Sequence, residues 1–329
     1  MPMTITLEGP NVGRDSLDEA QRNEVEELVL AEGVVTVGTR AFRGLPQLRR
    51  VVIPSTVENW GSGAFRECPT LTEVIVKSQT IGERAFAQCI ALNDITLKGT
   101  TTVGELAFAG CRPKVLESVK RQRRTNVLLA KFNEYAGRVE AYRSDYQAVC
   151  TRFDAIGDWR DANVLGELVY AQDNHIANLA LANAQIPDVR AIDPNQLGDF
   201  LNRLSAGLRD GAEDARLADF QQEFFRMVPA GHHQPILIFT RHIAGAAHDR
   251  YVPVPRFSAM DACYRWMAAH DLIDERFGGG PGGDARENLL LWLRQSKAVH
   301  NALRTYLSDK SDAERGVFAW LLVNNQGLR

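Results

Sequence analysis

The chain has 329 residues, which is long enough for two domains with separate hydrophobic cores. A formal net charge of -3, with 24% charged residues, argues against a global attraction to nucleic acid or to an anionic membrane. The sequence lacks a run of about 18 apolar residues and a basic, apolar leader, so we expect neither a membrane-spanning helix nor a signal peptide. Five cysteines, an odd number, favour reduced thiols and a cytoplasmic location, or the interior of a host cell if the protein is an effector.

Residues 25–111 repeat a pattern at intervals of 21 to 23 residues. Each copy contains Gly-x-x-Ala-Phe, and the four copies end at Phe42, Phe65, Phe86 and Phe108. Three positions after these residues come Leu45, Cys68, Cys89 and Cys111, and aliphatic residues follow at further fixed positions. A period in the low twenties with so many aligned columns predicts a solenoid, in which stacked turns share one core.

Each repeat contains a short strand and a tight return. In Leu71-x-x-Val74-x-Val76 the alternation predicts a strand whose Val74 and Val76 face inward. The Gly of each motif is expected to allow a turn that a side chain would obstruct. We expect a capped short helix over residues 15–20 to close the N-terminal end, and Arg112-Pro113 to end the repeats.

The repeat consensus, Gly-x-x-Ala-Phe-x-x-Cys-x-x-Leu-x-x-Val/Ile-x-Ile/Val/Leu, resembles the leucine-rich repeat of the BspA-like type over residues 25–111. The resemblance implies a right-handed, curved solenoid with one short parallel strand per turn. It also implies recognition of proteins or surfaces rather than catalysis.

The outward positions of the predicted strands are the expected partner-binding surface. They are Glu27, Val29, Arg50, Val52, Glu73, Ile75, Asp94 and Thr96. A row of Val29, Val52 and Ile75 is unusual for a face that meets only water, and it favours a protein interface. The alternatives are that the C-terminal domain covers this row or that the row is ordinary solvated surface.

The second half of the chain is predicted to be helical. Apolar residues at heptad spacing from Leu128 to Ile156 predict one long helix from about Val115. With a second helix from Trp159 to about Gln185 it is expected to form an antiparallel hairpin over residues 114–185. A homodimeric coiled coil through residues 128–156 is the alternative.

A helical bundle is predicted over residues 195–329. Its expected helices are 195–209, 212–228, 258–275, 284–307 and 311–324, and residues 235–239 are either a lone strand or a buried helical segment. Residues 278–283 are rich in Gly and read as a flexible linker.

The sequence offers no strong candidate for chemistry. Cys68, Cys89 and Cys111 are read as a column of small buried thiols, because no His or carboxylate shares their position. The His residues of segment 232–248 lack a metal-binding motif and are read as loop or surface residues. Cys263 and His270 would lie about 10 Å apart along a helix, too far for a direct hydrogen bond. We therefore expect no catalytic residue, metal or cofactor.

One basic cluster follows the repeats. It contains Lys120, Arg121, Arg123 and Arg124. A solvated helix face is the expected role, and contact with an acidic protein, nuclear targeting or nucleic-acid contact are the alternatives.

The predicted fold class is α+β multidomain, with a repeat solenoid at residues 1–113 and an all-helical domain at 114–329. The leading functional hypothesis is an interaction or scaffold protein that binds one protein through the repeat face and another through the helical domain. One alternative is an effector-type enzyme, for example one resembling a ubiquitin ligase, with the solenoid as substrate reader. Cys150 and Cys263 lack the Cys-x-Asp setting of ligases that use a catalytic Cys. Another alternative is a structural component of a large assembly.

Overall fold

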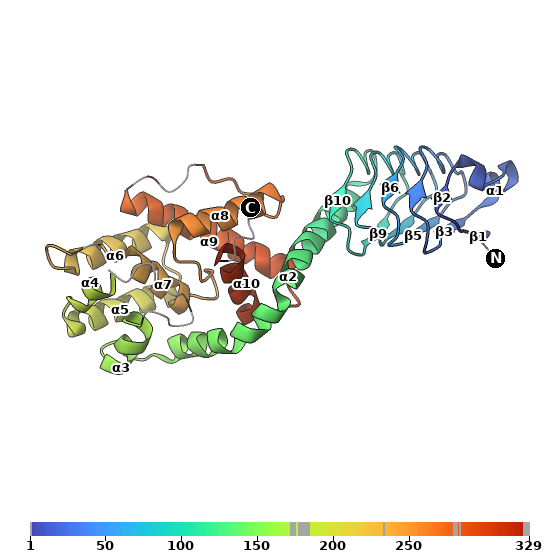
Figure 1. The fold of residues 1–329 in the computed structure, drawn as a ribbon. Coiled ribbons are helices and arrows are strands. Elements are labelled where there is room, and N and C mark those ends of the chain that lie inside the picture. The colour runs from blue at the N-terminus through green and yellow to red at the C-terminus, as the bar shows by residue number, and fades with distance from the viewer. Residues whose placement is uncertain are drawn as a thin grey trace. The chain divides into compact units, whose positions relative to one another are not determined.

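The computed structural model describes residues 2–171, 176, 185–232, 234–278, 282 and 284–324. It divides into two compact units, Met1–Lys131 and Phe132–Arg329. The first unit is a β-solenoid and the second is mostly helical, which confirms the predicted fold class (Figure 1).

The solenoid is built from short parallel strands. Its five-stranded sheet runs in the order β1 (Thr4–Leu7), β3 (Glu27–Leu30), β5 (Arg50–Ile53), β7 (Glu73–Val76) and β9 (Asp94–Leu97). Two-residue strands form the return segments, β2 (Asn11–Val12), β4 (Thr36–Val37) and β6 (Asn59–Trp60) in one sheet and β8 (Thr80–Ile81) and β10 (Thr102–Val103) in another. All the pairings are parallel, as expected for a coil that winds in one direction.

The core of the solenoid consists of columns of equivalent side chains from successive turns. The four Phe rings of the repeat motif stack, with neighbouring centroids 5.1 to 5.4 Å apart. The thiols of Cys68, Cys89 and Cys111 each donate to the backbone carbonyl of the Phe one turn back, at 3.2 to 3.3 Å. These free, buried thiols have the structural role predicted for them.

The motif Gly is required for close packing between turns. A Cβ atom on Gly61 would lie 2.0 Å from the backbone nitrogen of Thr39, and one on Gly104 would lie 2.6 Å from that of Glu83. A left-handed backbone occurs two residues after the motif Gly, for example at Arg84 with φ 49°. The expected turn is therefore present, but the Gly serves the approach of the neighbouring turn.

The N-terminal residues form a further, degenerate turn of the solenoid. Strands β1 and β2 continue the two sheets, and Leu17, only 4% exposed, joins the core. The helix predicted at residues 15–20 is wrong in position, since Arg14–Ser16 is a 3-10 turn (η1) and the helix α1 is Glu19–Glu24. Asp18 determines this start, because its side chain accepts a hydrogen bond from the amide of Gln21 in a capping box.

Helix α2 (Pro113–Ala155) begins where the repeats end, and its first turns belong to the solenoid unit. Val115 and Val119 join the hydrophobic core. The amide of Gln122 donates to Ile95 O and accepts from Leu97 N, both at 2.8 Å, so it pairs with β9 much as a further strand would. Asn126, one helical turn later, donates to Leu97 O at 3.1 Å and to Thr100 O at 3.0 Å.

The helical unit contains the rest of α2 and several shorter helices. They are α3 (Ala162–Val164), a π-helical turn η2 (Leu165–Val169), α4 (Gln185–Arg190), α5 (Pro194–Arg209), α6 (Asp214–Met227), α7 (Ile236–Ala246), α8 (Phe257–Ala269), α9 (Ala285–Tyr306) and α10 (Asp312–Asn324). The bounds of α5, α6, α9 and α10 agree with the predicted ones to within two residues. Helix α8 ends earlier than predicted, and the apolar run at 235–239 opens helix α7.

The heptad stripe of α2 packs inside its own unit, against helices α10 and α7. Phe132 and Tyr135 contact the ring of Phe318, with centroids 5.1 and 6.1 Å apart. Phe153 packs against the ring of His242 in α7. The homodimer through residues 128–156, which was the alternative to the hairpin, is not supported, because the stripe residues from Phe132 to Phe153 are buried within the chain except Tyr142, which is 45% exposed.

The predicted hairpin with a second long helix over residues 159–185 is not what the structure shows. Among the described residues of that segment, only 162–169 and Gln185 are helical, and residues 172–175 and 177–184 lie outside the described part. The sequence predicted that the next helix in the chain would pack on the heptad stripe of α2. In the structure, α10, which is distant in sequence, packs there instead.

Candidate functional site

The outward face of the β1-β3-β5-β7-β9 sheet carries two parallel rows of side chains. The register aligns Glu27, Arg50, Glu73 and Asp94 in one row. It aligns Val29, Val52, Ile75 and Thr96 in the other. All eight predicted partner-binding residues therefore lie on one surface, because strand residues two positions apart share a face and each turn repeats the same register.

Three members of the charged row, Glu27, Arg50 and Glu73, form a network of ion pairs. The guanidinium of Arg50 lies between two carboxylates: it contacts Glu27, and its Nε donates to Glu73 Oε2 at 3.1 Å. The hydroxyl of Thr4 in turn donates to Glu27 Oε2 at 3.2 Å. The hydrogen bond with Glu27, followed by that with Glu73, raises the pKa of Arg50. The charge of Arg50 is therefore paired with carboxylates of the adjacent strands.

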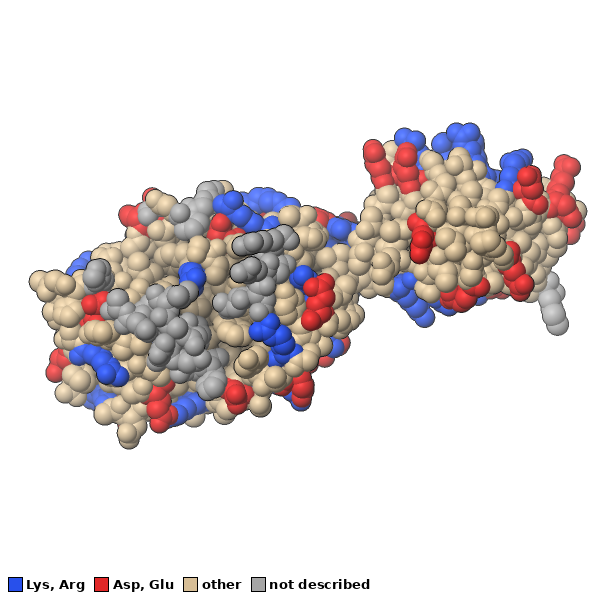
Figure 2. All heavy atoms as spheres, viewed as in Figure 1, with Lys and Arg blue, Asp and Glu red and all other residues tan. Residues whose placement is uncertain are grey.

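The apolar row is partly exposed. Val29, Val52 and Ile75 are half-buried, whereas the inward residues Val51 and Val74 on the same strands are fully buried. Thr96 extends the row on β9 and is exposed. Figure 2, which shows the solenoid from one side, draws its charged side chains mostly along the upper and lower margins in that view. Partly exposed aliphatic side chains therefore lie beside charged ones on this face of the sheet.

The basic cluster does not form a uniform surface. Arg121 is exposed, Lys120 and Arg123 are half-buried, and Arg124 is only 4% exposed. The expectation of a solvated basic face therefore does not hold for Arg124. These residues lie on α2 within the segment that closes the solenoid.

A buried pair that the sequence did not indicate lies in the helical unit. Ser205 Oγ of α5 is 3.2 Å from His242 Nε2 of α7, and the His ring packs edge-on against Trp159 with centroids 4.5 Å apart. Burial lowers the pKa of His242 to about 3, so the ring is neutral at physiological pH. Both side chains are at most 5% exposed, which gives a substrate no access to them. The expectation that His242 is a loop or surface residue is wrong.

The cysteines of the helical unit are also buried. Burial raises the pKa of Cys150 to about 12 and that of Cys263 to about 12. A nucleophilic cysteine requires the opposite environment, which lowers the thiol pKa. Neither residue is placed to act as the nucleophile of a ligase.

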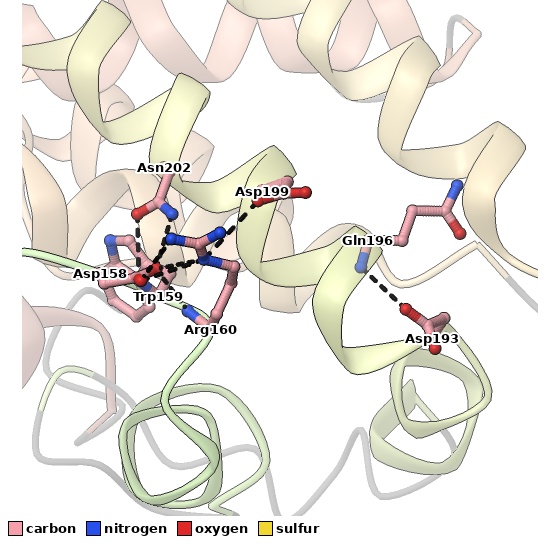
Figure 3. A network of polar contacts seen from close by, with 7 residues as sticks. All are labelled: Asp158, Trp159, Arg160, Asp193, Gln196, Asp199 and Asn202. Carbon is pink, nitrogen blue, oxygen red and sulfur yellow. Dashed lines mark hydrogen bonds and ion pairs between the residues drawn. The ribbon is translucent and has the colours of Figure 1, made fainter.

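The loop after α2 borders an open hollow of about 640 Å³, lined by Arg152, Ala155, Ile156, Gly157, Asp158, Arg160, Asp161, Ala162 and Val164. Figure 3 shows how two of its charged residues, Asp158 and Arg160, contact each other and α5. Arg160 donates from Nε to Asp158 Oδ1 and from Nη2 to Asp158 Oδ2, and Asn202 of α5 donates to the same carboxylate at 2.9 Å. The hydrogen bonds from Arg160 lower the pKa of Asp158 well below its usual range. This network holds the loop against α5. Asp158 and Arg160 pair with each other, so their charges are already neutralised within the hollow.

The structure also places some of the other residues that the sequence analysis considered. His233 and most of the Gly-rich segment lie outside the described residues. His248 contacts Asp154 at 3.1 Å, and His232 contacts Asp188 at 2.8 Å. Across the residues that the structure describes, no group of three or more His, Cys, Asp or Glu side chains could hold a metal ion. Nor does any described helix have the length and apolar character needed to span a membrane.

Comparison with protein families agrees with this geometry. Residues 20–128 match the model described as BspA type Leucine rich repeat region (6 copies). This segment is a BspA-type leucine-rich repeat region. The match extends past the last repeat into the turns of α2 that close the solenoid. No curated protein and no solved structure matches the chain.

Leucine-rich repeats generally mediate protein–protein interaction, and residues 20–128 match repeats of this type. It does not reach the helical unit beyond residue 128.

Proposed function

We propose that this chain is a protein-interaction or scaffold protein that binds a protein partner through the outward face of the β1-β3-β5-β7-β9 sheet. The observation that carries the proposal is the row of half-buried aliphatic residues Val29, Val52 and Ile75 beside a charged row. The repeat architecture supports it, since stacked turns present such rows as one extended surface. The helical unit serves a second contact in this proposal.

Photocrosslinking from the full-length chain tests the proposal. A benzophenone side chain at position 52 should capture a protein from native lysate, whereas one at Asn59, which is exposed on the return segments, should not. Equal capture from both positions, or none from position 52, would contradict a role for this face.

Substitution of the apolar row supplies the matched test. Val52→Asp with Ile75→Asp should abolish capture of that protein by a tagged chain, and Asn59→Asp should leave it unchanged. Val52→Thr with Ile75→Thr keeps the branched shape of both side chains and should still weaken capture. Thermal unfolding of each variant then shows whether a loss of capture comes from misfolding. Normal capture by a folded double variant would argue against the proposal.

A further inference from the structure

The charged row of the sheet face is not balanced. It contains the carboxylates of Glu27, Glu73 and Asp94 and the single guanidinium of Arg50, which gives a net charge of -2. Arg50 contacts Glu27 and Glu73, so its charge is used at the β3-β5-β7 end of the row. Within the row, the position on β9 is taken by Asp94 and not by a cation.

Asp94 is the unmatched member. It is exposed, and its Oδ2 accepts a hydrogen bond of 3.0 Å from the neutral amide of Asn93. In the part of the chain that the structure describes, no Lys or Arg forms an ion pair with it. The register places Glu73 directly beside it on β7, and like charges at neighbouring positions of a sheet repel each other. A cation supplied from outside would relieve that repulsion.

Apolar surface adjoins these carboxylates. Ile75 follows Glu73 by two residues on the same face, and Thr96 follows Asp94 in the same way. Residues two apart on a strand are separated by about 7 Å. A bound peptide segment in extended conformation can therefore place a charged side chain at the carboxylate and an apolar side chain at the neighbouring apolar residue. The strand positions of Lys77 and Lys98 lie four residues, about 13 Å, from those of Glu73 and Asp94, beyond the screening distance of about 8 Å at physiological ionic strength, and the ammonium group of Lys77 lies 3.9 Å from Glu32. Their repulsion of a cation at Asp94 is therefore weak.

We propose that the occupant of this face is a cationic protein segment, in which Lys or Arg side chains contact Glu73 and Asp94 while adjacent aliphatic side chains cover Val52 and Ile75. This inference rests on the proposed function and specifies the chemistry of the partner. Charge complementarity selects the partner and the apolar row supplies the buried area.

Selection of peptides tests the proposal without knowledge of the natural partner. A phage library of random twelve-residue peptides is selected on the full-length chain, with the Val52→Asp, Ile75→Asp variant as the counter-target. Enriched peptides should combine Lys or Arg with aliphatic residues. Their Kd should increase about fivefold for Glu73→Gln with Asp94→Asn, in line with the modest strength of partly exposed ion pairs. The same neutralisation elsewhere on the solenoid, Glu58→Gln with Glu105→Gln, should leave Kd unchanged.

The outcomes separate this inference from the function on which it rests. Selection of neutral or acidic peptides that still depend on Val52 and Ile75 would overturn the cationic partner and leave a protein-binding face in place. Peptides that bind both chains equally, or no enrichment at all, would count against both proposals. Light scattering that shows a dimer dissociated by the double Asp variant would identify a second copy as the occupant and overturn the cationic segment.

Discussion

Arg22 acts as a substitute for missing backbone donors at the N-terminal end of the solenoid. In the interior turns, Ala64 O and Arg66 O accept hydrogen bonds from the amides of Phe42 and Gly44. The equivalent carbonyls of the preceding turn, Ala41 O and Arg43 O, accept instead from the guanidinium of Arg22, at 2.9 and 3.2 Å. The Arg22 side chain thus donates to both carbonyls at the end of the solenoid, where helix α1 replaces the backbone amides of a further repeat.

We expect Arg22→Ala to destabilise the solenoid by about 2 kcal/mol, because two partly buried carbonyls lose their donors. Arg22→Lys should recover only part of this, since an ammonium group cannot reproduce the planar fork that reaches both carbonyls. The measurement is the denaturant dependence of alkylation of the buried Cys68, Cys89 and Cys111. The exposed Arg40→Ala is the control, and equal effects of both Ala variants would refute the capping role.

His242 should make the helical unit sensitive to acid. Burial lowers its pKa in the folded chain to about 3, whereas the unfolded chain takes up the proton near 6.5. The stabilisation is complete above pH 6.5 and is lost as the pH falls towards 3, because only the unfolded state binds the proton in that window. At about 1.4 kcal/mol per pH unit, the loss between pH 6.5 and 4.5 is about 2 to 3 kcal/mol.

His242→Gln should reduce this slope, as measured by urea unfolding of the helical unit at pH 7 and 4.5. The slope should not vanish, because burial also lowers the pKa of His300 to about 4. The exposed His270→Gln is the control. An unchanged slope in His242→Gln would show that the buried ring does not control the acid response.

At the scale of elements, the first turns of α2 complete the solenoid sheet. Gln122 and Asn126, one turn apart, occupy the backbone groups of β9 that the next strand would otherwise bind. An open strand edge would expose those groups to other chains. Helix α2 therefore stabilises the solenoid through two side-chain amides as well as through Val115 and Val119.

Replacement of both amides, Gln122→Ala with Asn126→Ala, should accelerate hydrogen exchange of the Leu97 amide by at least about tenfold, because Gln122 Oε1 is its acceptor. The solenoid should lose about 2 kcal/mol of stability. Gln147→Ala, on an exposed side of the same helix, is the matched control. Unchanged exchange at Leu97 would exclude the amide pairing.

For the whole molecule, the capping function of α2 predicts how the chain can be divided. A fragment of residues 1–131 should be soluble and monomeric, because it keeps the Val, Gln and Asn side chains that cover the last turn. A fragment of residues 1–113 should aggregate, since it exposes the Phe108 end of the core and the edge of β9. Size-exclusion chromatography with light scattering distinguishes the two, and a well-behaved shorter fragment would contradict the cap.

The sequence alone determined the solenoid and the identity of its outward face. Four copies of Gly-x-x-Ala-Phe set the period, and alternation within each strand decides which residues face out, so Val52 and Ile75 could be placed without coordinates. Helices α5, α6, α9 and α10 were equally readable, because apolar periodicity and caps are local signals.

Only the tertiary structure decided what these elements contact. The first turn was missed because its motif, Gly13 to Leu17, lacks both Ala and Phe, and only the pairing of β1 with β3 reveals it. The same holds for contacts between residues distant in sequence. They are the caps formed by Arg22 and Gln122, the packing of the α2 stripe on α10 and the buried Ser205–His242 pair. Periodicity shows that a side chain is buried, but the partner that buries it is set by the three-dimensional packing of the whole unit, which no local pattern contains.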